Sequence, residues 1–280
     1  MVKIIADTLS SIPVEEAKKM GVAYLPQIVI FGEDSYRDDT EMDSETFIEK
    51  LKTSTTLPKT AAPYPHLYKP ILDELTRNSK DEILIICPSA KMSGTYSRAE
   101  VAVNDYPDAN ITVVDTPLIG AGLGVLVRIA KQMADEGKSA KEISKEIMDL
   151  AEKNRTYFLV DTLEYLQKGG RIGAAKALVG SVLQVKPILG IVDGQVEAIE
   201  QQRTRKKALA RFIELVCEQC PSAEDAYLNV QHGGVLHEGE ELAEHLKQKI
   251  GINEIPVTNL PPAILVHGGP GILGVSFFVR

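Results

Sequence analysis

The chain has 280 residues, with 31 Lys and Arg against 39 Asp and Glu, which gives a net charge of −8. This acidic balance argues against a nucleic-acid-binding surface, which is normally basic, and an aromatic content of 5% without any Trp provides few side chains for stacking on bases. The length exceeds that of a typical single domain and predicts two domains.

The first half of the chain alternates between two hydrophobic patterns. Short runs that are apolar along their whole length are typical of strands buried on both faces, as in a parallel sheet. Apolar residues at helical spacing predict helices between those strands. The predicted strands are Val2–Ala6, Leu25–Phe31, Glu82–Pro88 and Ile111–Thr116, and the predicted helices are Tyr64–Arg77, Ser93–Asp105, Gly120–Asp135 and Ala140–Ala151.

The pattern changes after about residue 155. Asp193-Gly194 separates two β-branched runs, Ile188–Val192 and Gln195–Glu200, and this arrangement predicts a hairpin. An apolar stripe from Ala208 to Val216 predicts a helix. Further strands are predicted at Tyr157–Val160, Tyr227–Val230, Ile264–Val266 and Gly274–Val279.

These patterns predict an α/β protein of two domains. Residues 1–154 are expected to form an N-terminal α/β domain with a parallel sheet. Residues 155–280 are expected to form a C-terminal α/β domain whose sheet is mixed or antiparallel, because hairpins replace the regular strand–helix alternation.

Several common catalytic motifs are missing from the sequence. There is no Walker motif, no Gly-x-Ser-x-Gly nucleophile elbow and no His-Glu-x-x-His. Gly120-Ala-Gly-Leu-Gly lacks the third glycine of a dinucleotide-binding fingerprint, since Val125 stands there. Cys217-x-x-Cys220 has the spacing of a metal or redox site but has no second pair. We therefore expect no metal, no cofactor and no catalytic residues.

The three cysteines, Cys87, Cys217 and Cys220, do not form a disulfide framework, which favours a reduced intracellular compartment. The longest apolar stretch, Pro117–Val127, is too short for a bilayer, which needs about 20 residues. Asp7 interrupts the N-terminal apolar run before a signal peptide can form. We expect a cytoplasmic protein without stable membrane insertion.

Short polar clusters follow several predicted strands, and ligands of open α/β sheets bind beyond the carboxyl ends of strands. Asp7–Ser11 follows the first strand, and Ser93-Gly94-Thr95 stands where a helix is expected to start. Ser93 is a natural N-cap there, and a helix N-terminus attracts anions. The spacing alone is compatible with a plain cap and with a ligand site.

A basic cluster of Arg203, Arg205, Lys206 and Lys207 opens the helix predicted around Ala208, where cations oppose the helix macrodipole. The cluster is compatible with a solvated charge run and with contact to an anionic partner. Lys168-Gly169-Gly170-Arg171 is similar, because its paired glycines permit a tight backbone that brings Arg171 to the surface.

Taken together, these clusters resemble the DegV family of bacterial fatty-acid-binding proteins. The resemblance extends nearly from end to end. It rests on Ala6-Asp7-Thr8, Ser93-Gly94-Thr95-Tyr96, Val114-Asp115-Thr116, the block Thr162–Ile172 with its Gly-Gly-Arg-Ile ending, Lys186-Pro187-Ile188-Leu189, Asp193-Gly194, Arg203 and the block His267–Gly274.

The resemblance implies a two-domain DegV-like fold that holds a long-chain fatty acid. The N-terminal domain would carry the headgroup-site loops, and the C-terminal domain would cover the acyl tunnel between the domains. The protein would be a lipid-binding carrier rather than an enzyme. It would present the carboxylate to a fatty-acid kinase, an ATP-binding partner protein, and the acyl phosphate would feed phospholipid synthesis.

The resemblance also implies the roles of individual residues. Hydroxyls matching Thr60 and Ser93 would hold the carboxylate, and Gly94 and Thr95 would also belong to the ligand-binding site. Arg203 and His267 would lie near the same end of the tunnel. For contact with the kinase or its phosphate we expect the basic residues Arg171, Arg205 and Lys206.

Burial of the tail supports such a carrier, because fifteen methylenes at about 0.8 kcal/mol each contribute roughly 12 kcal/mol before association costs. Two alternatives stay open. Thr60-Ala61-Ala62 stands where the family usually has Thr-Ser-Gln, which keeps a carrier of a different apolar ligand in view. Ser93 with His267 would form the nucleophile and base of an acyl-transfer enzyme, although no carboxylate is clearly placed to orient the histidine.

Overall fold

The computed structural model describes residues 1–78, 80–179 and 185–280. The chain forms two compact units, the first made of Met1–Asp43 and Ser54–Glu152 and the second of Ser44–Thr53 and Lys153–Arg280. The chain therefore enters the second unit twice, and the first entry is a single helix, α2 (Ser44–Thr53).

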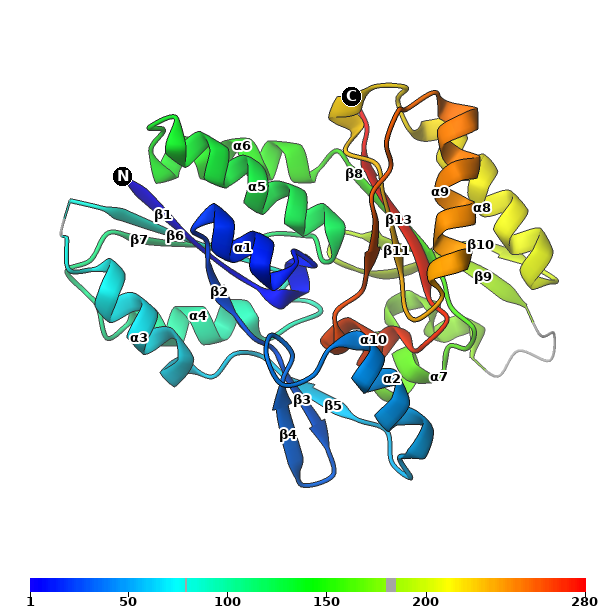
Figure 1. Cartoon of the computed structure of the whole chain (residues 1–280), viewed down its shortest axis with the longest axis horizontal. Helices are drawn as coiled ribbons and strands as arrows, with labels where there is room; N and C mark the ends of the chain where they lie inside the picture. Colours follow the sequence, from blue (N-terminus) through cyan, green and yellow to red (C-terminus); the bar gives the residue numbers. More distant parts are fainter. Residues whose placement is uncertain (79, 180–184) are drawn as a thin grey trace. The chain divides into compact units, whose positions relative to one another are not determined.

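The first unit is built on a parallel sheet of four strands in the order β2-β1-β6-β7. Helices α3 and α4 cover one face of this sheet, and α5 and α6 cover the opposite face (Figure 1). Helices on both faces explain why the strands are apolar along their length. The bounds are β1 Val2–Asp7, β2 Ala23–Leu25, β6 Glu82–Cys87, β7 Ile111–Asp115, α1 Val14–Met20, α3 Pro65–Leu75, α4 Thr95–Val103, α5 Ala121–Asp135 and α6 Ala140–Ala151.

The first unit also contains a small antiparallel sheet that the sequence patterns do not predict. It consists of β3 (Ile28–Phe31), β4 (Asp34–Arg37) and β5 (Lys59–Ala61) in the order β4-β3-β5. The single strand predicted at Leu25–Phe31 is wrong, since β2 ends at Leu25 and β3 begins at Ile28. Pro26 lies in the gap and has no N–H to donate to a ladder.

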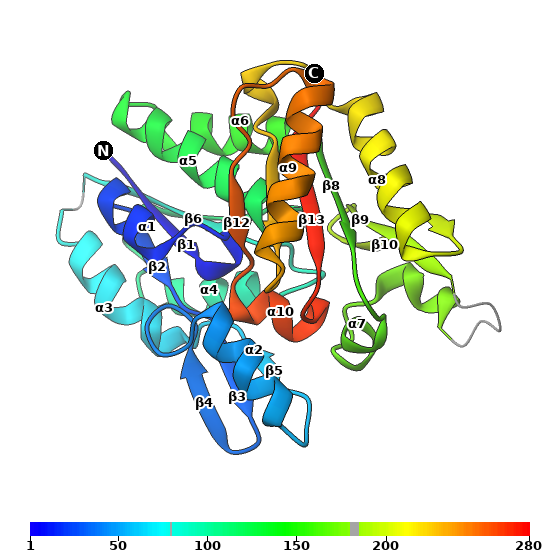
Figure 2. The ribbon, with the colours of Figure 1, turned by 45° about the vertical axis from the view of Figure 1, so that its right-hand side comes forward.

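The second unit is built on a six-stranded mixed sheet in the order β10-β9-β8-β13-β11-β12. Only the β11–β12 pair is parallel among these neighbours. Helices α8 (Arg205–Gln219) and α9 (Leu236–Ile250) pack against the sheet (Figure 2). The strands are β8 Asn154–Leu159, β9 Lys186–Val192, β10 Gln195–Gln202, β11 Asn229–His232, β12 Val257–Asn259 and β13 Leu273–Phe278.

The predicted hairpin is confirmed. Val192 and Gln195 pair across the turn between β9 and β10, and Asp193 and Gly194 have φ values of 48° and 76°. Two central residues at positive φ are the signature of a type I′ turn, whose twist matches that of the flanking strands.

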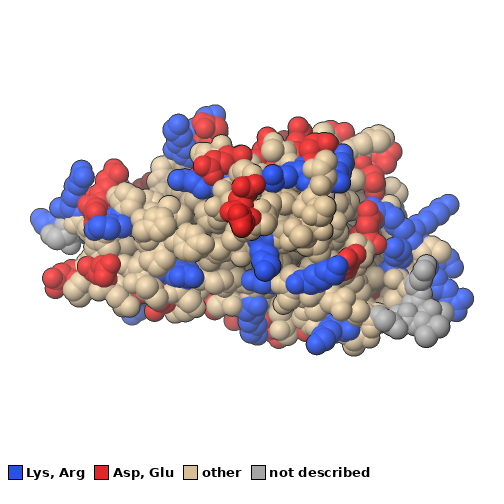
Figure 3. Space-filling view, turned by 90° about the horizontal axis from the view of Figure 1, so that it is seen from below, with Lys and Arg blue, Asp and Glu red and all other residues tan. Residues whose placement is uncertain are grey.

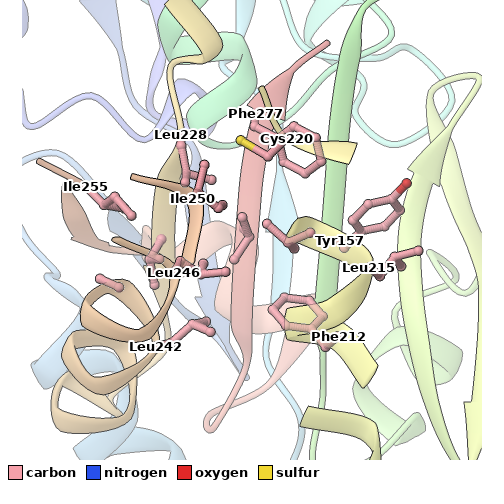
Figure 4. Close-up of a cluster of buried hydrophobic side chains, with 14 of the residues drawn as sticks. Tyr157, Phe212, Leu215, Cys220, Leu228, Leu242, Leu246, Ile250, Ile255 and Phe277 are labelled. Carbon is pink, nitrogen blue, oxygen red and sulfur yellow. The ribbon is translucent and has the colours of Figure 1, made fainter. Parts of the chain in front are cut away.

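A hydrophobic core fills the space between the mixed sheet and its two helices (Figure 4). Phe212 of α8, Leu246 of α9 and Phe277 of β13 are fully buried in it. Cys220 belongs to the same core, and burial raises the pKa of its thiol to about 12. Cys220 is therefore a packing residue. Within the described residues, no group of His, Cys, Asp and Glu is arranged to hold a metal ion.

The strand predicted at Ile264–Val266 is wrong, because these residues lie in α10 (Pro262–Gly268). A short apolar run does not distinguish a strand from a buried helix, and here Pro262 starts the helix at a position that suits proline. The remaining elements are α7 (Glu164–Lys168) and the 3₁₀ segments η1 (Thr8–Ser10), η2 (Gly173–Leu178) and η3 (Glu224–Ala226). None of the helices in the described part of the chain is both long and apolar enough to cross a bilayer.

Candidate functional site

A buried polar cluster lies at the carboxyl end of β1. Asp7 is the last residue of that strand and is 1% exposed, and Thr8 and Ser10 of the following 3₁₀ turn are also buried. The Asp7 carboxylate accepts a hydrogen bond from the Leu9 N–H, at 3.1 Å from Oδ1. This contact fixes the turn that follows β1 and leaves Oδ2 for partners from other segments.

Gln27 and Thr95 supply those partners. The Gln27 side-chain amide, in the gap between β2 and β3, donates to Asp7 Oδ2 at 2.6 Å and lies 3.0 Å from Thr95 Oγ1. Thr95, the first residue of α4, donates to Asp7 Oδ2 at 2.7 Å. One carboxylate oxygen therefore joins three segments of the first unit.

Ser93 is attached to this cluster through Thr95. The two hydroxyl oxygens are 3.0 Å apart, and the Thr95 N–H donates to Ser93 Oγ at 3.3 Å. The predicted helix start at Ser93 is two residues early, because α4 begins at Thr95 and Gly94 occupies the N-cap position. Ser93 is half-buried, and its hydroxyl is positioned by the side chain and backbone N–H of Thr95, the first residue of the helix.

Asp38 forms a second buried carboxyl group beside the first. It follows β4, is 8% exposed and accepts hydrogen bonds from Thr8 Oγ1 at 2.8 and 3.0 Å. The backbone N–H of Gln27 donates to Asp38 Oδ1 at 2.8 Å. Gln27 therefore contacts one carboxyl through its side chain and the other through its backbone.

Burial dominates the protonation of both carboxyl groups. It raises the pKa of Asp7 to about 7, against the opposing effect of the hydrogen bonds from Thr95, Leu9 and Gln27. It raises the pKa of Asp38 to about 8, and the charge of Asp7 adds to this shift. Both groups therefore exchange protons near neutral pH rather than near pH 4, where exposed carboxyls titrate.

Thr60 belongs to the small antiparallel sheet of the first unit. In β5 it pairs with the buried Val29 of β3, and directly opposed residues point to the same face. Two residues further on, the Cβ of Ala62 lies 3.6 Å from the position that a Cβ would occupy on Gly94. The segment directly after β5 therefore lies against the turn 93–95, and the roles of Thr60 and Ser93 stay predictions.

The second unit holds His267 in a separate close-packed cluster. His267 lies at the end of α10, and a Cβ on Gly169, directly after α7, would collide with its ring nitrogen Nδ1. Arg171 donates to the Gly169 carbonyl at 2.7 Å. Burial, together with the smaller effect of the Arg171 charge, lowers the pKa of His267 to about 4. His267 is therefore a neutral imidazole, packed against the Gly-Gly-Arg segment.

The basic residues predicted to meet a partner differ in their surroundings. Arg205 forms ion pairs with Asp161 and, at 2.9 Å, with Glu238. Arg171, which the paired glycines predicted to reach the surface, is partly exposed and lies beside His267. Arg203 and Lys206 are exposed at the start of α8. The opposition of Arg205 to the helix macrodipole is therefore balanced by two carboxylates.

Three residues of the cluster have no assigned role in the sequence analysis: Asp7, Gln27 and Asp38. Asp7 lies in a polar cluster that the sequence does single out. Gln27 and Asp38 follow short strands without any motif, and their partners are 20 and 30 residues away along the chain. The one available signal for Gln27 is a polar residue directly after Pro26 inside an otherwise apolar run.

The comparisons with known proteins agree over the whole length of the chain. The sequence model described as "Uncharacterised protein, DegV family COG1307" matches residues 1–280. A DegV domain-containing protein of Halalkalibacterium halodurans is 31% identical over 279 residues, which cover 100% of this chain and 99% of that protein. Protein DegV of Bacillus subtilis is 31% identical over 277 residues, with 99% and 98% covered.

Solved structures show the same fold. DegV of Bacillus subtilis, described as a fatty acid binding protein, matches with a TM-score of 0.88 and 29% identity, covering 100% of this chain and 99% of that one. A fatty-acid-binding DegV family protein of Streptococcus agalactiae matches with a TM-score of 0.90, 26% identity and the same coverage. A stearic-acid-binding protein of Eubacterium ventriosum matches with a TM-score of 0.86 and 25% identity, covering 100% and 98%.

The contact between Gly169 and His267 gives a testable prediction. Gly169→Ala forces the His267 ring to move, and a displaced ring regains solvent. We expect the pKa of His267, measured by NMR titration of its imidazole, to rise from about 4 toward its ordinary value of 6.5. Gly137→Ala is the control for general destabilisation, because it strains a glycine at a φ of 82° in the first unit without meeting any neighbouring atom and without contact to His267. An unchanged His267 titration in Gly169→Ala would contradict this packing.

Proposed function

The chain belongs to the DegV family, and from this membership and the Ser93 cluster we propose that it binds a long-chain fatty acid and holds its carboxylate at Ser93 and Thr60. The observation that carries the proposal is the Ser93 hydroxyl. It is half-buried, and Thr95 positions it through two contacts, while Ala62, two residues after Thr60, lies against the adjacent Gly94.

Hydroxyl groups suit a carrier that has to release or pass on its ligand. A hydroxyl donates one hydrogen bond to a carboxylate oxygen, whereas an arginine fork occupies both oxygens. Binding energy then comes mainly from burial of the hydrocarbon, and the headgroup contacts supply orientation. In this proposal one carboxylate oxygen stays available for reaction with a phosphate group.

The contacts of Ser93 favour non-covalent binding over acyl transfer. A serine nucleophile is activated by a direct hydrogen bond to a general base. The Ser93 hydroxyl instead contacts the Thr95 hydroxyl, which donates to Asp7. The low pKa of His267 leaves that imidazole a weak base.

We further propose that the bound acid is presented to a fatty-acid kinase, whose acyl-phosphate product feeds phospholipid synthesis. The support is chemical: an ionised carboxylate with one free oxygen is ready to attack a phosphate without a catalytic base. Basic side chains at the start of α8 would meet the kinase. Figure 3 shows Lys and Arg side chains gathered at the right-hand end of the face drawn, the side where Figure 1 draws β9, β10 and α8.

Lys206 is the best candidate for this contact, because its side chain is exposed. Arg203, which is also exposed, keeps its proposed place near the headgroup end of the tunnel. Arg205 forms ion pairs with Asp161 and Glu238. We therefore propose that Arg205 shapes this surface and does not itself contact the kinase. Arg171 would act through His267, beside which it lies. Charges of this kind mainly change the rate at which two proteins associate.

Fatty-acid binding is tested by removing the two hydroxyls together. Solvent extraction and mass spectrometry of the purified protein should release a long-chain fatty acid. Thr60→Val with Ser93→Ala should weaken its binding by at least about tenfold, because each lost hydrogen bond to a charged group costs about 1.5–3 kcal/mol. Thr56→Val is the matched control, an exposed threonine of the same unit whose contacts use its backbone. Unchanged binding in the double variant, or no fatty acid bound at all, would refute the proposal.

The kinase contact is tested by reversing one charge. Lys206→Glu should lower kcat/KM for acyl-phosphate formation in a coupled kinase assay by about fivefold or more, with unchanged fatty-acid affinity. A glutamate in the first turn of α8 suits the helix macrodipole, so loss of the helix does not explain such a decrease. Lys153→Glu makes the same charge change at another exposed position of this unit. Equal rates in both variants would argue against the contact.

A further inference from the structure

The hydrogen bonds around Thr95 impose a strict count of protons. A hydroxyl has one proton to donate and two lone pairs to accept with. Thr95 Oγ1 has three polar neighbours: Gln27 Nε2 at 3.0 Å, Asp7 Oδ2 at 2.7 Å and Ser93 Oγ at 3.0 Å. The amide nitrogen of Gln27 can only donate, so it takes one lone pair. One proton and one lone pair remain for Asp7 and Ser93.

The charge of Asp7 decides how these two are assigned. An ionised Asp7 accepts only, so the Thr95 proton points at Asp7 and Ser93 has to donate its own proton to Thr95. Because the Thr95 N–H takes one lone pair of Ser93, the hydroxyl then offers one lone pair and no proton to a ligand. A protonated Asp7 donates from Oδ2 to Thr95, and Thr95 donates to Ser93. The Ser93 proton is then free to be donated to a ligand.

We propose that Asp7 and Thr95 are positioning residues that set the direction of the Ser93 hydroxyl, so that a carboxylate binds to Ser93 with uptake of one proton by Asp7. The proton comes from solvent and forms an O–H bond on Asp7, while the ligand stays anionic. This inference rests on the proposed function, since it concerns the same Ser93. It adds a regulation of that site by pH.

The surroundings of Asp7 favour the neutral form once an anion arrives. The titratable groups that interact with its charge are Asp38 after β4, Tyr24 of β2, Tyr68 of α3 and Cys87 of β6. A negative Asp7 raises the pKa of each of them. Residues 1–78, 80–179 and 185–280 provide no ion pair to Asp7, so its charge is balanced by hydrogen bonds and by no cation. Burial has already raised its pKa to about 7, which keeps the proton accessible.

Coupling of ligand binding to proton uptake predicts that the fatty-acid affinity falls as the pH rises. Above the pKa of Asp7, each pH unit should weaken fatty-acid binding by about tenfold, because one proton has to be taken up per ligand. Free fatty acid is ionised over the same range and does not itself produce this slope. Thr95→Val removes the hydroxyl that links Asp7 to Ser93 and leaves the Ser93 proton free at any pH. The fatty-acid affinity of this variant should therefore not depend on pH. Thr95→Ser keeps the linking hydroxyl, and its affinity should depend on pH as that of the native protein does.

The test measures binding of stearate to the full chain by calorimetry between pH 7.0 and 8.5. Phosphate and Tris buffers have different heats of ionisation, so the two series together count the protons taken up. We expect about one proton per stearate for the native protein and for Thr95→Ser at the high end of this range, and none for Thr95→Val. The ligand is the same in all three, so its own titration cancels in the comparison.

Asp7→Asn provides a second route if Thr95→Val does not fold. The introduced amide replaces the protonated acid as a donor to Thr95. Stearate affinity should therefore become independent of pH although Thr95 is intact. Tight stearate binding that is independent of pH in the native protein, or the native slope in Thr95→Val or in Asp7→Asn, would overturn the inference and leave the proposed function standing. Absence of stearate binding at every pH would overturn both.

Discussion

Asp7 is a carboxyl group held almost entirely out of water, and such a group has to be satisfied by hydrogen bonds or lose its charge. Its donors come from the turn after β1, from the gap between β2 and β3 and from the start of α4. The need to satisfy one carboxyl therefore brings together segments that are up to 88 residues apart. Ser93 owes its position to this arrangement, because Thr95 contacts both residues.

In the second unit the positions of the site residues are fixed by close packing rather than by a buried charge. Gly169 admits the His267 ring, and Gly271, at a φ of 80°, admits the carboxylate of Asp161, which in turn binds Arg205. The blocks Thr162–Ile172 and His267–Gly274 thus fit against one another because their glycines lack side chains. The two motifs that carry the family resemblance in this half of the chain form one packed structure.

Sequence patterns predict the framework of this protein better than its polar cluster. Three of the four apolar runs of the first half, such as Glu82–Pro88, form strands of the parallel sheet, whereas Leu25–Phe31 is divided between β2 and the antiparallel strand β3. Asp193-Gly194 predicted its hairpin because the turn chemistry is local. Ile264–Val266 failed because three apolar residues have no clear period. The boundary expected after residue 154 lies close to the return of the chain into the second unit at Lys153, whereas the excursion of α2 has no local signal.

The polar cluster was harder to predict because its contacts are tertiary. Ser93-Gly94-Thr95 stood out as a strand-to-helix turn, yet the neighbour that controls Ser93 is a carboxyl at the end of a different strand. Gln27 and Asp38 carry no motif, and their roles follow from donor geometry that only the folded chain supplies. The paired glycines before Arg171 have a second role that the sequence pattern does not indicate, since Gly169 allows the His267 ring to pack against it.

The central claim is that Asp7 takes up the proton when an anionic ligand reaches Ser93. Infrared difference spectroscopy at pH 8, with stearate labelled by ¹³C at its carboxyl carbon, measures this directly. The account predicts a new carboxylic-acid C=O band that is unaffected by the label and missing in Asp7→Asn. A carboxylic-acid band that shifts with the labelled stearate, or none at all, would contradict it.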